Sequence, residues 1–302
     1  MKLLMGIKKS RTIKSLILAA VAALILLAFG PAALADDLLQ KSARINEGCL
    51  RCHGAQGLKT KFIGETKSTS LYVNEQNYLV SMHGTMPCIY CHTNISDYPH
   101  VNAPTERKAL LNQVNGECRR CHKDITQMYN SSVHGQMNTE KGKVNAYCSD
   151  CHGVHNIYKK QVAEATINHN QVPHTCAKCH EEIMHQYELD FHAKSVLLGG
   201  KEAASCVSCH GSHTILGPEE EASTVSKENT PKTCGNCHLF PLDNFAKGKM
   251  HYELKPTGDG AVSFWTLEFF TWLTIGTIGF VLIMVLIELR RKWMDASKPD
   301  SH

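Results

Sequence analysis

The chain is strongly apolar near both ends and mixed in character between them. Basic residues occur between Lys2 and Lys14, and the segment from Ser15 to Ala35 then carries no charge. This segment ends in Ala-Leu-Ala, directly before the first acidic residues. A basic region, an apolar region and a small-x-small site are typical of a secretory signal peptide, so we expect one at residues 1–35. An uncleaved membrane anchor is the alternative interpretation.

A second uncharged run covers residues 269–287. It is long enough for the hydrocarbon core of a bilayer, which needs about 20 residues, and tryptophans flank it as at membrane interfaces. A basic cluster follows at 290–292. Because such flanks face the cytoplasm, we expect a transmembrane anchor over residues 263–293, a cytoplasmic tail over 294–302 and an exported domain before them. The buried helix of a soluble protein usually keeps a polar face, and this run has none.

The domain between these runs, residues 36–262, is poor in large apolar side chains. The chain as a whole is 43% hydrophobic, but the terminal runs and 14 cysteines contribute much of that. Modules with so little apolar area usually need metals, disulfides or cofactors to fold. The net charge is +4 and the basic residues are scattered, so nothing indicates a nucleic-acid partner.

Every cysteine belongs to a CxxC pair that is followed directly by histidine. Two thiols at this spacing add to the vinyl groups of a porphyrin, and the adjacent histidine becomes the proximal iron ligand. A disulfide framework or zinc sites are the alternatives, but neither requires that histidine. We therefore expect seven covalently bound haem c groups. The cysteines are Cys49 and Cys52, Cys88 and Cys91, Cys118 and Cys121, Cys148 and Cys151, Cys176 and Cys179, Cys206 and Cys209, and Cys234 and Cys237. The histidines are His53, His92, His122, His152, His180, His210 and His238.

The motifs form tandem modules of two. The same interval separates Cys118 from Cys176 and Cys176 from Cys234, which indicates a repeat. In each module, the first motif leads into a segment with apolar residues at helical spacing that ends in a histidine, so we predict a continuous helix such as His122 to His134. The second motif leads into a turn and another histidine. The first module is a looser copy, and the last is a half.

Seven histidines outside the motifs occupy repeat-related positions, one for each expected iron. Those at the ends of the helical segments are His83, His134, His192 and His251, and those in the turns are His100, His155 and His213. A continuous helix is too long for its two terminal histidines to meet at one iron, so each should ligate a neighbouring haem. The remaining histidines are expected to be solvated or packed: His169, His174, His185 and His302. Of these, His174 is the rival of His100 as a ligand.

With these motifs, the chain resembles the multihaem c-type cytochromes of anaerobic respiring bacteria with doubled CxxCH motifs. The resemblance is carried by SVHG at 132–135, CSDCHGVH at 148–155 and CVSCHGSH at 206–213. It implies low-spin haems with two histidine ligands, short helices and irregular loops, and electron transfer between membrane quinol oxidation and periplasmic or outer-surface acceptors. The chain departs from the pattern in the wider spacing from His53 to His83 and in Ala193, which stands where other copies have glycine.

We therefore expect a mainly α-helical protein that is wrapped around seven haems and anchored by one C-terminal helix. Its expected place is the cytoplasmic membrane, with the haem domain on the periplasmic side. The expected partners are a quinol-oxidising or b-type cytochrome subunit, periplasmic redox proteins and lipid. We expect the haem on Cys234 and Cys237 to lie closest to the membrane.

Two other functions fit the motifs less well. A multihaem reductase of nitrite, hydroxylamine or tetrathionate needs an iron with an open position, but here all seven motifs end in histidine and enough further histidines exist to close every iron. We therefore expect no catalytic residue. A released, filament-forming cytochrome conflicts with the anchor.

Overall fold

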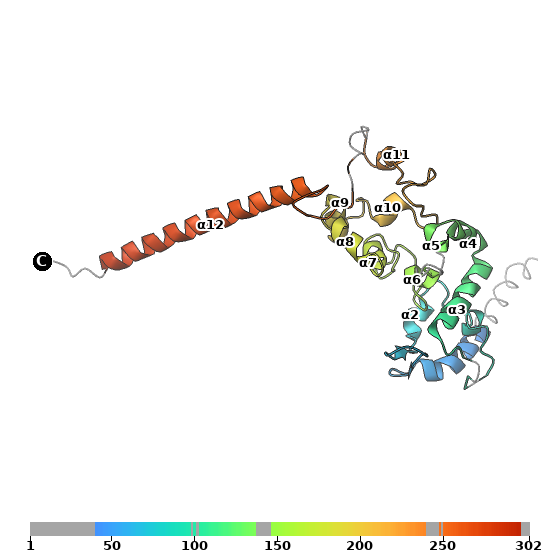
Figure 1. Ribbon diagram of the computed structural model, residues 1–302. Helices are drawn as coiled ribbons and strands as arrows, with labels where there is room; N and C mark the ends of the chain where they lie inside the picture. The colour runs from blue at the N-terminus through green and yellow to red at the C-terminus, as the bar shows by residue number, and fades with distance from the viewer. Residues whose placement is uncertain are drawn as a thin grey trace, which may run out of the picture.

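The protein is described by a computed structural model that covers residues 40–97, 99–100, 103–136, 146–239, 248 and 250–296. The expected signal peptide and His302 lie outside the described residues. The described part is mainly helical. A domain of short helices and loops occupies one end of the molecule, and one long helix projects from it (Figure 1).

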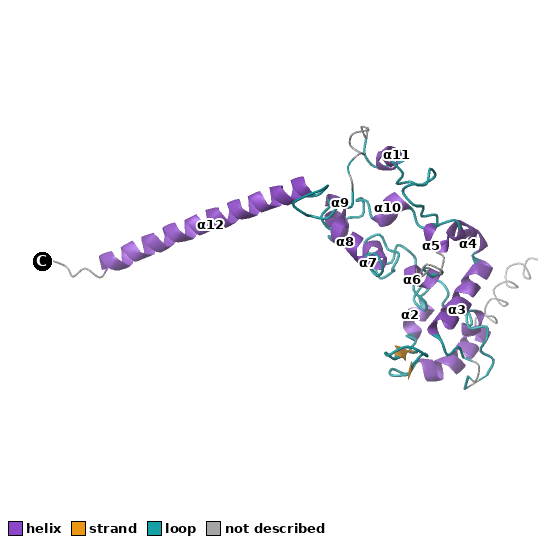
Figure 2. Cartoon of the chain, in the orientation of Figure 1, coloured by secondary structure: helices purple, strands orange, loops and turns teal. Residues whose placement is uncertain are grey.

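Short helices alternate with loops along the haem-motif domain (Figure 2). One helix covers residues 40–53. The others are α2 (Glu75–Leu79), η1 (Cys88–Tyr90), α3 (Arg107–Cys121), α4 (Lys123–Asn130), α5 (Val133–Gln136), α6 (Cys148–His152), α7 (Val172–Ala177), α8 (Glu181–Tyr187), α9 (Phe191–Leu197), α10 (Cys206–His210) and α11 (Thr230–Gly235). A small antiparallel sheet pairs β1 (Lys59–Thr60) with β2 (Thr69–Ser70), with Lys59 opposite Ser70.

The CxxCH motifs help to set these helix boundaries. The helices α6 and α10 each consist of one motif, and each ends at a glycine with positive φ, Gly153 at 79° and Gly211 at 74°. A residue without a Cβ adopts this left-handed conformation most readily, so the glycine stops the helix just after the motif histidine. The helices α7 and α11 both begin with a proline in the first turn, where its missing N–H costs nothing.

The predicted continuous helix from His122 to His134 is wrong. In the structure, α4 ends at Asn130 and a separate helix, α5, carries His134. The third module is broken in the same way between α8 and α9. The apolar spacing alone did not reveal the breaks, because both halves keep a helical period.

In both modules, a polar side chain two residues before the helix-end histidine causes the break. The hydroxyl of buried Ser132 donates to the carbonyl of Tyr129 at 2.7 Å and accepts from the N–H of Gly135 at 3.1 Å. It therefore ends one helix and caps the next. Asp190 caps α9 by accepting from the N–H of His192 at 2.9 Å. Each cap turns the histidine-bearing helix onto a new axis.

The apolar core of the described residues is small. Its one packed cluster joins Met184, Tyr187 and Ala193, with Ala177 against it. The chain exposes 23297 Å², whereas a compact protein of its size would expose about 12,700 Å². Part of the excess comes from the projecting helix, and the described domain has little apolar core of its own.

The C-terminal helix, α12 (Ala261–Ala296), is long and apolar enough to span a membrane. Its 36 residues would extend for about 54 Å, well beyond a hydrocarbon core of about 30 Å. None of its apolar window is buried. This finding agrees with the anchor expected at residues 263–293.

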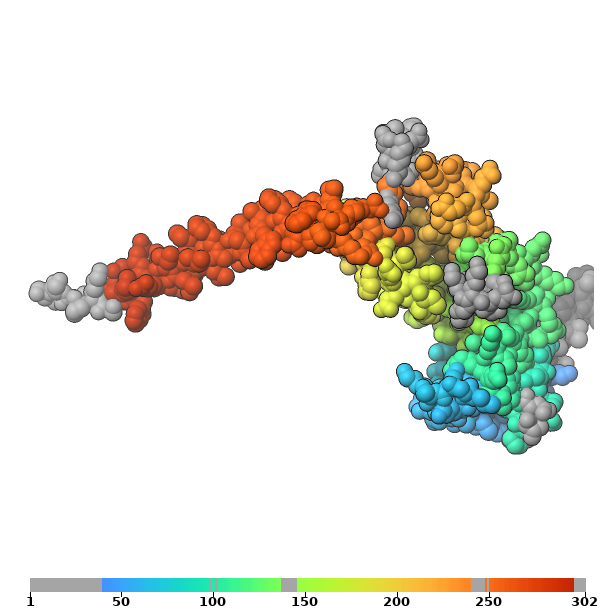
Figure 3. All heavy atoms as spheres, in the orientation of Figure 1, coloured from blue at the N-terminus to red at the C-terminus, as the bar shows by residue number. Residues whose placement is uncertain are grey.

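The start of α12 is held against the preceding loop. Tyr252 and Ser263 share a hydrogen bond of 3.2 Å between their hydroxyls, and the indole N–H of Trp265 donates to the carbonyl of Pro256 at 3.2 Å. The helix therefore leaves the domain from a defined place. Figure 3 shows α12 projecting from one end of the molecule and the N-terminal module lying at the far end.

Candidate functional site

The described residues contain seven close pairs of histidine rings, and each pair joins one motif histidine to one histidine from outside the motifs. The ring centroids lie 5.9 to 6.2 Å apart in every pair. All fourteen histidines singled out in the sequence take part, and each belongs to a single pair. The pairs are His53 with His100, His92 with His155, His122 with His83, His152 with His213, His180 with His134, His210 with His251, and His238 with His192.

This separation fits one metal ion between the two rings. A histidine nitrogen lies about 2.0–2.1 Å from a bound metal and roughly 1 Å from its own ring centroid, so two axial imidazoles place their centroids about 6 Å apart. Rings stacked in direct contact would approach to about 3.5–4 Å. His152 and His213 are almost parallel, at 5°, yet their centroids are 5.9 Å apart.

Each histidine pair could provide two protein ligands to one metal ion. Among the described residues, no group of three or more histidine, cysteine or acidic side chains could hold a metal ion. Structural zinc takes four protein ligands, so these pairs do not form zinc sites. A metal held by only two opposed histidines needs its other ligands from a cofactor, and the four nitrogens of a porphyrin meet that requirement. The residues therefore fit haem.

The cysteines are placed as haem attachment requires. All fourteen are free thiols, so no disulfide framework is formed. In six of the seven pairs, the second cysteine is exposed, while the first is half-buried. Each pair lies within one helical turn of its histidine, as in α6 and α10.

The outer nitrogens of the first pair are bonded to the backbone. The Nδ1 of His53 lies 2.9 Å from the carbonyl of Leu71, and the Nδ1 of His100 lies 3.0 Å from that of Asp97. A carbonyl only accepts, so in both rings Nδ1 carries the proton and Nε2 is left for a metal. Such outer contacts fix the tautomer and the ring orientation of a ligand.

Burial keeps many of the paired histidines neutral. It lowers the pKa of seven of them, and the pKa of His155 falls to about 4 because its buried ring also faces His92. Neutral imidazole is the form that ligates a metal, so this environment favours ligation at neutral pH. The other six are His83, His92, His134, His152, His210 and His251.

The pairs connect neighbouring modules. His83, His134 and His192 each face the first motif histidine of the next module. His155, His213 and His251 each face the second motif histidine of the previous module. His122 and His134 thus lie in different pairs, as do His152 and His155.

The first module forms one histidine pair within itself, and some described histidines lie in none of the seven pairs. His100 faces His53 within the first module, and its rival His174 is in none of these pairs. His185 lies on the surface beside Glu188. His169 has a buried Nε2 with no hydrogen-bond partner in the described structure. The wide first module therefore closes on itself through His100.

Backbone contacts beside the histidines join the modules in a repeated way. The N–H of Met82, which precedes His83, donates to the carbonyl of Ile157 at 2.8 Å. The N–H of Val133, which precedes His134, donates to the carbonyl of Ile215, also at 2.8 Å. In each case, a histidine loop of one module is bonded to the turn of the next. No sequence signal identified these contacts.

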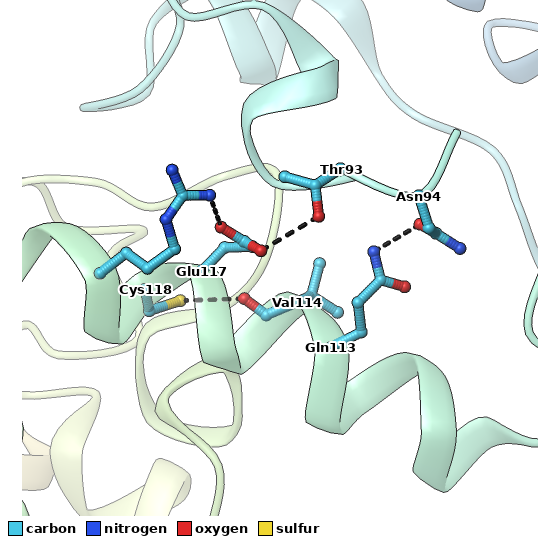
Figure 4. A network of polar contacts seen from close by, with 7 residues as sticks. Thr93, Asn94, Gln113, Val114, Glu117 and Cys118 are labelled. Atoms are coloured by element: carbon cyan, nitrogen blue, oxygen red, sulfur yellow. Dashed lines mark hydrogen bonds and ion pairs between the residues drawn. The ribbon is translucent and has the colours of Figure 1, made fainter. Parts of the chain in front are cut away.

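Side chains around α3 join the first two modules (Figure 4). Thr93, which follows the second motif, donates to Glu117 at 3.0 Å, one residue before the third motif. The amide of Gln113 donates to Asn94 nearby. The thiol of Cys118 points back along α3 and donates to the carbonyl of Val114 at 3.6 Å. This network places the second and third motifs side by side.

In each full module, one tyrosine hydroxyl donates to a backbone carbonyl just before the second motif and so positions that motif. The hydroxyl of Tyr78 donates to the carbonyl of Met86 at 2.5 Å, and that of Tyr187 donates to the carbonyl of Ala204 at 2.7 Å. Tyr129 donates to the carbonyl of Ala146. Each acceptor stands two residues before a second motif. Burial raises the pKa of Tyr78 to about 12. In the sequence, each of these tyrosines stands five residues before the helix-end histidine of its module.

Successive motifs lie next to one another in space within each full module. The thiols of Cys118 and Cys148 interact, which raises the pKa of Cys118 and lowers that of Cys148. Cys176 and Cys206 form the same kind of pair. Burial raises the pKa of Cys88 to about 12, and Cys49 beside it acts in the same direction.

The second motif of each full module also interacts with the first motif of the following module. Burial raises the pKa of Cys91, Cys151 and Cys209, and a cysteine of the following motif acts in the same direction. Those neighbours are Cys121, Cys176 and Cys234, respectively. Consecutive CxxCH motifs therefore follow one another in space in their sequence order.

No protein-family model, no curated protein and no solved structure matches the chain.

Proposed function

We propose that the chain is a membrane-anchored multihaem c-type cytochrome that binds seven haem c groups and transfers electrons between a membrane quinol-linked partner and periplasmic acceptors. One observation carries the proposal: every CxxCH histidine faces a second histidine at 5.9 to 6.2 Å. Bound haem supplies reversible one-electron chemistry at its iron.

The chain's own residues hold and shield the cofactors. Each cysteine pair would form two thioether bonds, and the two histidines of a pair would bind opposite faces of one iron. Because each motif histidine is matched by a second histidine, the residues of each pair would leave no position on the iron open to a substrate. This arrangement favours electron transfer over the alternative, a reductase of a small nitrogen or sulfur oxyanion.

The order of the motifs supports a chain of haems that leads away from the membrane. Consecutive motifs are neighbours, and α12 leaves the domain at the end opposite the first module (Figure 1). Electrons entering near α12 would therefore pass toward the haem on Cys49 and Cys52. The basic residues after the apolar run favour a cytoplasmic C-terminus, with the haem domain in the periplasm.

The proposed entry point includes two haems. The sequence suggested the haem on Cys234 and Cys237, whose motif stands nearest the anchor. In the structure, His251 faces His210, and its neighbour Tyr252 bonds to Ser263 of α12. The haem on Cys206 and Cys209 would therefore share the membrane end with the last haem. A quinol-oxidising or b-type cytochrome subunit beside α12 is the proposed donor.

Mass spectrometry of the denatured protein tests the proposal. We expect the mass of the processed polypeptide plus seven haems, because thioether bonds survive denaturation. The oxidised protein should lack the methionine-to-iron absorption band at the red end of its spectrum. Membranes should release the protein into detergent but not into high salt. Six haems or fewer, or release by salt alone, would contradict the proposal.

A further inference from the structure

A carboxylate stands beside one paired histidine at the membrane end of the chain. The Oδ1 of Asp190 accepts from the backbone N–H of His192 at 2.9 Å and lies 3.3 Å from the Nδ1 of the same residue. The Asp190 side chain is only 19% exposed. His192 faces His238, the histidine of the last motif. A largely buried negative charge is therefore fixed against a proposed ligand by the helix cap itself.

The first histidine pair shows outer nitrogens that contact neutral groups. His53 and His100, at the far end of the chain, contact backbone carbonyls. The position two residues before the helix-end histidine is serine in the first two modules, at Ser81 and Ser132. Only the third module places an acidic residue there.

Asp190 also acts on a second pair at the same end. Burial lowers the pKa of His251, and the charge of Asp190 acts on it in the opposite direction. The Nδ1 of His251 is buried without a hydrogen-bond partner in the described structure. His251 faces His210. The direct contact of Asp190 is with His192, and its charge also acts on His251.

We propose that Asp190 lowers the reduction potential of the haem held by His192 and His238. A negative charge on the outer side of a ligating imidazole makes the ligand more basic and stabilises ferric iron more than ferrous iron. Haems whose ligands contact neutral carbonyls lack this effect. Electrons delivered at the membrane end would therefore move energetically downhill, away from α12. This inference rests on the proposed function.

The test compares the reduction potentials of the complete haem-loaded protein and of Asp190→Asn. Asparagine keeps the size and the capping ability of aspartate but removes the charge. At a fixed potential near the midpoint, we expect the ratio of reduced to oxidised iron in the last haem to rise about tenfold, which is about 59 mV for a one-electron couple. The electron paramagnetic resonance signal of that ferric haem should shift in the same variant.

Glu188→Gln is the matched control. Glu188 lies 3.6 Å from the Nδ1 of His185, so it forms the same kind of contact two residues away, but with a surface histidine outside the seven pairs. The control should leave all seven potentials in place, as should Asp190→Glu. If Asp190→Asn loads fewer haems, Asp190→Ser, which also caps a helix, replaces it in the comparison.

The possible failures are distinct. A wild-type protein that carries no covalent haem would overturn the proposed function. Seven haems in the wild type, with titration curves of Asp190→Asn and Glu188→Gln that coincide with it, would overturn this inference alone. A shift of equal size in all seven haems would also overturn it, because the contact to His192 is local.

Discussion

The rings of His152 and His213 lie 5.9 Å apart and within 5° of parallel, although they belong to different modules. His152 ends the motif helix α6, and His213 follows the motif helix α10 in a turn. Nothing local brings them together. Their contact depends on the docking of one module against the next, which is the structural principle of the whole domain.

His213→Ala should convert one haem of the seven to the high-spin state. A haem on Cys148 and Cys151 would keep its thioether bonds and His152 but would lose its proposed second ligand. Electron paramagnetic resonance of the oxidised protein measures the change. His185→Ala, at an exposed histidine outside the pairs, should leave every haem low-spin. A wholly low-spin His213→Ala protein would show that His213 is not a ligand.

Gly135→Ala should destabilise the second module by about 1–3 kcal/mol, as overpacking does. A Cβ on residue 135 would overlap the carbonyl oxygen of Tyr129, so the loop carrying His134 must move. Gly116→Ala is the control, because a Cβ there meets nothing within 4 Å and alanine favours the helix α3 by up to about 1 kcal/mol. Denaturant unfolding measures both. Equal stabilities would contradict the described packing.

Tyr187→Phe should lower the free energy of unfolding by about 1 kcal/mol, the usual net value of one hydrogen bond. The variant keeps the ring but leaves the carbonyl of Ala204 without its 2.7 Å partner. Tyr158→Phe should change little, because the described structure gives the Tyr158 hydroxyl no hydrogen bond. The comparison uses urea midpoints. A Tyr187→Phe midpoint equal to that of the wild type would argue against a positioning role.

Glu65→Gln should remove a pH-dependent part of the stability of the first module. Arg107 binds Glu65 at 2.5 Å, and its hydrogen bond holds the pKa of Glu65 below the ordinary value of 4.5. Because the folded pKa is lower than the unfolded one, this contribution is present above pH 4.5 and is lost as pH falls through the folded pKa.

Wild type and Glu65→Gln should therefore differ in urea midpoint at pH 7 and converge in strong acid. The effect is small, since the pair is exposed and salt screens it. Glu47→Gln, at an exposed glutamate with no ion pair in the described structure, is the control. A difference between wild type and Glu65→Gln that grew on acidification would contradict the pairing.

Local chemistry made several features readable from the sequence alone. The CxxCH spacing determines which cysteines and which histidine can share one porphyrin, because those groups lie within one helical turn. The run from Phe269 to Ile287 is long and uncharged, so it predicts a helix that can span a membrane. The structure contains this helix as α12. The repeat singled out the seven further histidines because each recurs at a related position.

Only the tertiary structure decided how these parts combine. Which two histidines face each other depends on the docking of loops such as Met82 onto Ile157, which are distant in sequence. The break before His134 follows from the buried hydroxyl of Ser132, whose two hydrogen bonds no apolar period can reveal. No sequence pattern singled out Asp190, and its contact with the Nδ1 of His192 is a feature of the folded chain. Contacts between residues that are distant in sequence depend on packing, whereas sequence periodicity indicates only contacts between residues that are close along the chain.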